Sequence, residues 1–240
     1  MRVTVTAAGL DAGVDARAPT GARVEQVPRV AGRTARRGAR APSSGARTSG
    51  DFAEALIHAR RTVLPKRLLA PGPDARQLER ILRAASAAPD HDQRTPWRFV
   101  LVQVAARTVL AEGFAAALRE RDPAANPAQL AQAREKAFRA PTLLLAVART
   151  GLPGDGVPLA ERLVSAGCAI QNVLLMATAL GFGSALTSGQ ALQSRALREL
   201  FALGSGEQAL CFVNIGTASS APPPRARPAV RSYVRELGSP

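Results

Sequence analysis

The longest apolar pattern in the chain covers residues 159–180 and predicts a helix. Apolar residues occupy nearly every side of the helical wheel. The one glycine in the segment, Gly167, does not prevent a helix. A helix of this kind is buried on all sides. At 1.5 Å per residue it is about 33 Å long, enough to run through a domain or along a subunit interface. Glu161, Arg162 and the adjacent amides of Gln171 and Asn172 argue against a membrane span, so we expect the central helix of a soluble domain.

Shorter patterns predict further helices and strands before and after this helix in the chain. Continuous apolar runs predict three buried strands, at residues 99–104, 142–148 and 209–217. Helical spacing predicts further helices at residues 52–62, 75–85, 107–121, 127–139 and 192–201. Asp74 is placed to cap the second of these, and Pro65 ends the first. Residues 181–189, rich in glycine and hydroxyl side chains, are predicted to form a loop. Buried strands separated by helices indicate an α+β or α/β layer structure with a small sheet.

Composition separates residues 1–50 from the rest of the chain. This segment mixes Ala, Gly, Arg, Thr, Ser and Pro without a period, and it holds no aromatic residue. We expect a disordered tail or an upstream extension, followed by one folded domain at residues 51–240. An Arg-rich targeting or nucleic-acid-binding arm is the alternative.

The net charge of +14 says more about the ligands that we expect than about the fold. Lys66 and Lys136 are the only lysines, and the many arginines beside many alanines suggest a biased genome composition. Aromatic residues make up 4% of the chain, too few for base-stacking platforms, so a nucleic-acid partner is not favoured. A basic surface still favours anionic ligands such as phosphates. Cys168 and Cys211 lie far apart and form no disulfide pattern, and no signal peptide is visible, so we expect a cytoplasmic protein.

The sequence offers little for metal binding or nucleophilic catalysis. His58 and His91 are the only histidines, and three consecutive residues such as Asp90, His91 and Asp92 rarely converge on one ion. No Ser-His-Asp order fits.

Five short segments, in this order, resemble the nitroreductase family, and most closely its short bacterial NAD(P)H nitroreductases that bind FMN. They are Arg60-Arg61-Thr62, residues 88–91 (Ala-Pro-Asp-His) with 96–99 (Pro-Trp-Arg-Phe), residues 165–169 (Ser-Ala-Gly-Cys-Ala), residues 179–183 (Ala-Leu-Gly-Phe-Gly) and residues 212–217. The resemblance extends over residues 52–235. It implies a three-layer α+β homodimer with two FMN molecules at the subunit interface and the central helix packed against its twin. It also implies ping-pong chemistry, in which NAD(P)H reduces FMN and a small-molecule acceptor such as a nitro compound or quinone is then reduced.

The resemblance further implies roles for individual residues. Arg60, Arg61 and Thr62 would hold the FMN phosphate and ribityl chain, with threonine where serine is usual, and guanidinium groups suit a phosphate dianion. One of Arg225 and Arg227 would also reach the phosphate, although a polyproline ligand for a partner is the other interpretation of that segment. The loop residues expected to line the FMN are Leu186, Thr187 and Ser188. The residues associated with the nicotinamide nucleotide are Met176, Ala177, Thr178, Ala179, Leu180 and Gly181.

Other positions are open to two interpretations. His91 would reach across to the flavin of the other subunit, or it would only hydrogen-bond its own loop. Trp97 is interpreted as a core residue, and Gly181 as the residue past a helix end that takes a positive φ. Ala87 stands where some relatives carry a basic residue, and Leu186 and Thr187 replace bulkier or charged residues. A flavin-binding protein without turnover is therefore the second hypothesis, and a nucleic-acid-binding protein is the third.

Overall fold

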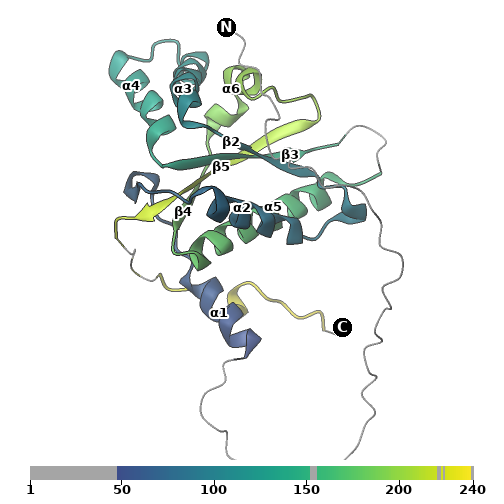
Figure 1. Cartoon of the computed structure of the whole chain (residues 1–240). Helices are drawn as coiled ribbons and strands as arrows, with labels where there is room; N and C mark the ends of the chain where they lie inside the picture. The colour runs from purple at the N-terminus through teal and green to yellow at the C-terminus, as the bar shows by residue number, and fades with distance from the viewer. Residues whose placement is uncertain (1–47, 152–155, 221–222, 224, 239–240) are drawn as a thin grey trace, which may run out of the picture. The chain divides into compact units, whose positions relative to one another are not determined.

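An antiparallel sheet of five strands divides the fold into three layers (Figure 1). The computed structural model describes residues 48–151, 156–220, 223 and 225–238. The strand order is β1-β5-β3-β2, and β4 also pairs with β5. The strands are β1 (Leu68–Leu69), β2 (Trp97–Leu101), β3 (Thr142–Arg149), β4 (Gly183–Thr187) and β5 (Glu207–Ala218). The three strands predicted from apolar runs are confirmed as β2, β3 and β5, although β2 begins two residues earlier than expected and ends at Leu101.

Helices cover both faces of the sheet, so the α+β prediction is confirmed. The α-helices are α1 (Ser49–Ala59), α2 (Ala75–Arg83), α3 (Arg107–Arg121), α4 (Pro127–Glu135), α5 (Leu159–Ala179) and α6 (Arg195–Leu200). Figure 1 shows α3, α4 and α6 on one face and α2 with α5 on the other. The predicted cap on α2 is present, since the Asp74 carboxylate accepts a hydrogen bond from the Gln77 amide at 2.8 Å. The cover on both faces explains why the central strands β3 and β5 have continuous apolar runs.

The predicted loop over residues 181–189 is wrong, because residues 183–187 form β4. The segment is rich in small and polar residues, so it has no apolar pattern typical of a strand. It is a strand because it pairs with β5, which lies about thirty residues further along the chain. Gly183 is needed there, since a Cβ would lie 2.9 Å from Leu68 Cδ2 and 3.0 Å from Val63 Cγ2. The helix predicted over 127–139 also ends early, at Glu135, and a short 3₁₀ turn (Lys136–Phe138) follows.

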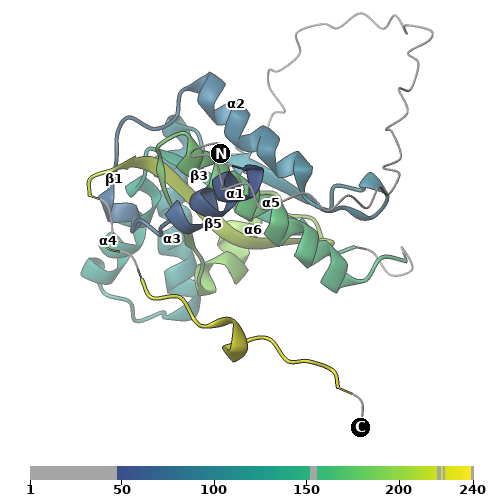
Figure 2. The ribbon, with the colours of Figure 1, turned by 90° about the horizontal axis from the view of Figure 1, so that it is seen from below.

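The long helix α5 is confirmed, but it is not buried on all sides. Its inner face packs into the core beside α2 and the sheet through Ala166, Ala169, Val173 and Ala177. On the opposite face Val164 is 63% exposed and Leu163 is 37% exposed. Figure 2 views the molecule from the side of the sheet on which α5 lies. By length and composition α5 could cross a membrane, but its inner face is part of the protein core.

Two apolar clusters fill the spaces between the layers. The cluster under α2 and α5 includes Trp97, whose indole N–H donates to Ser165 Oγ at 3.1 Å, so its predicted core role is confirmed. The cluster under α3 and α6 contains three packed phenylalanines, Phe114, Phe201 and Phe212. Nearly all of the predicted tail at residues 1–50 lies outside the described residues, so that prediction remains a prediction. Residues 49–240 form one compact unit.

One ion pair ties the edge strand β2 to the start of β5. Arg98 donates from Nε and Nη2 to the two carboxylate oxygens of Glu207, at 2.7 and 2.9 Å. This hydrogen bonding lowers the pKa of Glu207 from 4.5 to about 2, against the opposing effect of burial. A carboxyl group with a depressed folded-state pKa stabilises the fold above its unfolded pKa and loses that effect as the pH falls.

We therefore expect Glu207→Gln to lower the free energy of unfolding by about 1–3 kcal/mol at pH 7. The cost should shrink as the pH falls from 4.5 towards 2, because the wild-type carboxylate is then protonated. Urea unfolding at pH 7 and pH 3 measures both effects. Glu79→Gln is the matched control, since the Glu79–Arg83 pair is exposed and should contribute less than about 0.5 kcal/mol. An equal cost of Glu207→Gln at both pH values would contradict this account.

Candidate functional site

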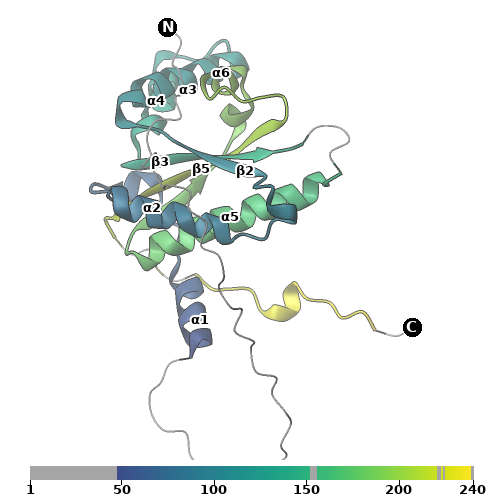
Figure 3. The same cartoon turned by 45° about the vertical axis from the view of Figure 1, so that its right-hand side comes forward.

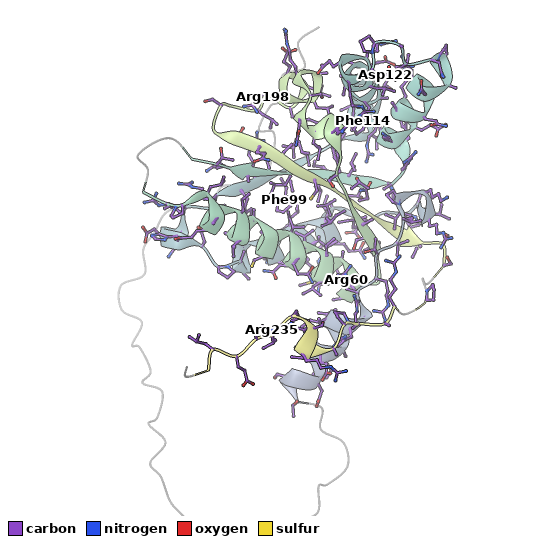
Figure 4. The ribbon with its side chains drawn as sticks, turned by 180° about the vertical axis from the view of Figure 1, so that it is seen from behind. Arg60, Phe99, Phe114, Asp122, Arg198 and Arg235 are labelled. Carbon is purple, nitrogen blue, oxygen red and sulfur yellow. The ribbon has the colours of Figure 1, made fainter. Side chains whose placement is uncertain are left out.

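Arginines from the two ends of the folded unit meet in one small pocket. The pocket has a volume of about 70 Å³ and is lined by Arg60, Arg61, Thr62, Pro223, Arg225 and Arg227. Figure 4 shows Arg60 where α1 joins the layered body. The structure thus brings together five of the predicted site residues across more than 160 positions of sequence. Four guanidinium groups and a hydroxyl, with no carboxylate in the lining, fit a phosphate dianion.

The segment that carries these arginines is fixed against β4. Thr62 forms an isolated bridge with Ser184, and the Val63 amide donates to the Ser184 carbonyl at 2.9 Å. The buried Val63 side chain packs with Leu68 below this crossing. Arg61 folds back onto the end of the first helix, where its guanidinium donates to the backbone carbonyls of His58 and Arg60. The crossing therefore sets the position of the phosphate-type pocket relative to the sheet.

A larger pocket of about 500 Å³ lies at the end of β4. It has an apolar floor from α3, β3, β5 and the turn after β4, with polar groups around it. Its lining residues are Pro65, Phe114, Arg121, Lys136, Arg139, Leu143, Thr187, Ser188, Gly189, Gln190, Ala191, Leu192, Phe212 and Asn214. A concave site with an apolar floor and a few polar groups suits a flat organic ring.

The two pockets are neighbours along the chain. Thr62 lines the small one and Pro65 lines the large one, so the backbone between them spans at most about 11 Å. Asn214 of β5 fixes the side of the large pocket, since its Nδ2 donates to Thr187 Oγ1 at 3.0 Å. A phosphate at one end of a ligand would suit the small pocket, and a flat ring at the other end would suit the large one.

Two of the three residues predicted around the flavin line the large pocket. They are Thr187 and Ser188. Leu186 lines neither pocket, and its side chain is 44% exposed on the other side of β4. Leu186 and Thr187 differ in this way because they are successive residues of a strand, whose side chains point to opposite faces.

His91 lies at a different place in the same chain. Its Nδ1 is 2.9 Å from Glu161 Oε2, which belongs to the first turn of α5. Figure 3 shows α5 and α2 together on one side of the sheet. Residues 176–181 are at the other end of that helix, about 22 Å from Glu161 at 1.5 Å per residue. His91 lines neither the small nor the large pocket of its own chain. Among the described residues, no group of three His, Cys, Asp or Glu side chains could hold a metal ion.

The six residues predicted for the nicotinamide nucleotide line none of the pockets described above. Ala177 is buried in the core, and the Thr178 hydroxyl donates to the Leu174 carbonyl at 2.9 Å. Gly181 has φ 84° directly after the helix, which confirms its predicted conformation. The nucleotide role of this segment remains a prediction.

Several residues of the large pocket had no recognisable signal in the sequence. Arg121, Lys136 and Arg139 look like ordinary surface charges on helices, and Asn214 looks like a polar interruption of a strand. The pKa of Lys136 lies below its usual value, first because neighbouring atoms desolvate it and then because Arg139 and Arg121 are close. These residues become a group only when β4, β5 and α3 are assembled.

Comparison with known proteins agrees with this geometry. The model of the Nitroreductase family matches residues 57–217. Two relatives carry the name "Putative NAD(P)H nitroreductase". The one from Escherichia coli (strain K12), YdjA, is 36% identical over 169 residues, which are 70% of this chain and 88% of the relative. The one from Haemophilus influenzae is 37% identical over 152 residues, which are 63% of this chain and 82% of the relative.

The chain belongs to the nitroreductase family. The resemblance drawn from the five short segments is thereby confirmed. Solved structures support the same fold. A nitroreductase-like protein from Bacillus cereus superposes with a TM-score of 0.69 at 20% identity, over 82% of this chain and 100% of that one. The FMN-dependent nitroreductase NfnB from Mycobacterium smegmatis, solved in complex with NADPH, superposes with a TM-score of 0.60 at 17% identity, over 79% and 99%.

Proposed function

We propose that this nitroreductase-family protein is an FMN-dependent NAD(P)H oxidoreductase that acts as a homodimer in the cytoplasm. The observation that carries the proposal is the pocket lined by four arginines, together with a larger pocket whose lining begins three residues further along the chain, at Pro65. FMN has one dianionic phosphate and one flat ring joined by a short chain, and the donor sets of the two pockets suit these two parts. The names of the relatives, NAD(P)H nitroreductases, support the choice of electron donor.

The residues of the two pockets have separate tasks in this proposal. Arg60, Arg61, Arg225 and Arg227 neutralise the phosphate, and the Thr62 hydroxyl donates to it. Thr187 and Ser188 orient the ring at the end of β4, and Asn214 holds Thr187 in place. Phe114 and Phe212 form part of the apolar floor that excludes water beneath the ring.

When bound, FMN supplies two-electron chemistry, accepting hydride from NAD(P)H and passing the electrons to a second substrate. A nitro compound that takes two electrons and two protons leaves as a nitroso compound and water, and a quinone leaves as a hydroquinone. Donor and acceptor use the same pocket in turn, which gives ping-pong kinetics. We place the nicotinamide nucleotide near residues 176–181, where the exposed backbone at Gly181 is the accessible part.

The unpartnered surfaces support a homodimer. Val164 and Leu163 are exposed on α5, and a Cβ on Gly167 would meet nothing within 4 Å, so a second backbone could approach closely. Helix α1 has no buried residue, although Phe52 and Ile57 are apolar. An isolated helix of eleven residues is marginal in water, so α1 needs a packing partner. In such a dimer His91, which is remote from its own chain's pockets, would reach the flavin of the partner subunit.

A flavin-binding protein without turnover is the second candidate. It is favoured by Ala87, an exposed small residue two positions before Pro89, where some relatives carry a basic side chain. The two functions differ in whether NAD(P)H reduces the bound flavin.

The purified protein should be yellow, or become yellow with added FMN, and it should oxidise NAD(P)H when a nitroaromatic or a quinone is present. Anaerobic NADH or NADPH should bleach the flavin absorbance near the visible maximum. A colourless protein that FMN cannot reconstitute would refute the proposed function. Binding without bleaching would establish the second candidate instead.

Arg60→Ala and Arg225→Ala should each weaken FMN binding by about 1.5–3 kcal/mol, which is roughly a 10- to 150-fold rise in Kd, because each loses charged hydrogen bonds to the phosphate. Fluorescence titration of the apoprotein measures the Kd. Riboflavin, which lacks the phosphate, should bind wild-type and variants alike. Arg76→Ala, an exposed arginine of α2 outside both pockets, is the matched control. Unchanged FMN affinity in both pocket variants would remove the phosphate assignment.

Val164→Asp should convert the dimer into a monomer, because it buries a charge at the proposed interface. Light scattering after size exclusion measures the mass. Val109→Asp on α3 is the matched control, since Val109 is 40% exposed but lies on another layer. If the wild-type protein is itself a monomer, or if Val164→Asp remains a dimer, the interface is not where we place it.

A further inference from the structure

Three cations lie together at one side of the large pocket. Arg121 ends α3, and Lys136 and Arg139 follow α4. All three also line an adjoining pocket of about 220 Å³, so they occupy the region shared by the two cavities. Neither lining contains an Asp or Glu side chain. We call these three residues the cationic rim.

Within residues 48–151 and 156–220, none of the three rim residues forms an ion pair with a carboxylate. The nearby carboxylates have other partners. Glu112 accepts from Arg134 at 2.7 and 3.0 Å, and Glu120 accepts from the backbone amides of Arg195 and Ala196 at 3.0 and 2.8 Å. Glu135 precedes Lys136 in the chain but lines neither pocket. The lowered pKa of Lys136 reflects the same imbalance, since Arg139 and Arg121 contribute to it after desolvation.

The backbone that carries two of the rim residues is anchored from below. Arg107 is buried, and its guanidinium donates to the carbonyl of Ala137 at 2.6 Å and to that of Pro141 at 3.1 Å. These two carbonyls lie on either side of Arg139 in the chain, and Ala137 directly follows Lys136. The buried guanidinium of Arg107 therefore holds the backbone on both sides of Arg139, although the side chains of the rim are exposed.

The phosphate of the cofactor does not need these charges. Four other arginines line the small pocket, and none of the three rim residues does. In Figure 4 the labelled Arg60 lies below the sheet and Phe114, which faces the rim pocket, lies above it. The rim therefore faces whatever molecule enters the large pocket beside the ring.

We propose that Arg121, Lys136 and Arg139 form an anion-binding subsite that selects electron acceptors carrying a carboxylate. The inference rests on the proposed function and names the substrate class of the same site. The acceptor's aromatic part would lie over the ring in the apolar pocket, and its carboxylate would meet the rim. Charged hydrogen bonds of this kind contribute about 1.5–3 kcal/mol each when they form in a partly enclosed site. The 2′-phosphate of NADPH is the other anion that could use the rim, and the experiment separates the two.

The test compares 4-nitrobenzoate with 4-nitrobenzamide, which has the same ring and nitro group but no charge. Wild-type enzyme loaded with FMN should show a kcat/KM at least about tenfold higher for 4-nitrobenzoate. Arg121→Gln, Lys136→Gln and Arg139→Gln should each lower kcat/KM for 4-nitrobenzoate by about tenfold and leave 4-nitrobenzamide within about twofold. Arg119→Gln, on the same helix as Arg121 but outside both linings, is the matched control.

A binding measurement gives a readout that does not depend on turnover. Isothermal titration of the oxidised, FMN-loaded protein with 4-nitrobenzoate should give a Kd that rises about tenfold in each rim variant and rises with salt. If neither acceptor is reduced but this pattern of binding holds, the proposed function fails and the subsite stands.

Three results would overturn the subsite. Equal losses with both acceptors would mean that the rim acts on the cofactor or the fold. The absence of any preference for 4-nitrobenzoate in the wild type, with normal turnover of both, would leave the oxidoreductase function standing without an acceptor subsite. A loss in kcat/KM for NADPH that spares NADH and both acceptors would assign the rim to the 2′-phosphate.

Discussion

The backbone pairing of β5 is the constraint on which the rest of the structure depends. This strand pairs with β3 along one edge and, near its end, with β4 and β1. Because β4 is held against β5, Ser184 is available to pair with Thr62 and Val63, and Thr187 lies beside Asn214. Through β4, this strand therefore fixes the position of the arginine pocket, and its own residues Phe212 and Asn214 line the large pocket. Neither pocket could form from its local segments alone.

Charge is distributed unevenly around the two pockets, and this unevenness defines what they can bind. Four guanidinium groups surround the small pocket, and three more cations border the large one, without a carboxylate in either lining. Some arginines elsewhere are paired with carboxylates, as Arg98 is with Glu207 and Arg134 with Glu112. The high net charge of the chain is therefore not a uniform surface property. Where cations gather without acidic partners, an anionic ligand completes the balance.

The helix α5 connects the core of one chain to the proposed second copy. One face supplies core alanines and valines, whereas the other presents Val164, Leu163 and the open surface over Gly167. The beginning of the helix holds His91 through Glu161, and its end leads through Gly181 into β4. A two-fold partner along this helix would bring the His91 of one subunit towards the flavin pockets of the other. The proposed dimer would thus account for the absence of His91 from both pockets of its own chain.

The sequence by itself determined the features that depend on local periodicity and on short segments. The long helix, the three apolar strands, the Asp74 cap, the core role of Trp97 and the membership of the nitroreductase family were all predictable, because each leaves a pattern within a few neighbouring residues. The individual groups Arg60 to Thr62, Arg225 and Arg227 were also predictable, but only through the resemblance to that family.

Only the tertiary structure decided the features that depend on distant pairing. Strand β4 has no apolar pattern and exists because β5 offers it a partner, so the predicted loop was wrong. The rim of Arg121, Lys136 and Arg139 comes from segments that look like ordinary solvated helix surface until α3 and β5 are placed beside each other. The exposed face of α5 likewise could not be foreseen, since an all-apolar wheel does not say which side meets the sheet. Burial, pocket lining and charge balance are properties of the assembled layers, because they depend on which distant atoms exclude water from a side chain.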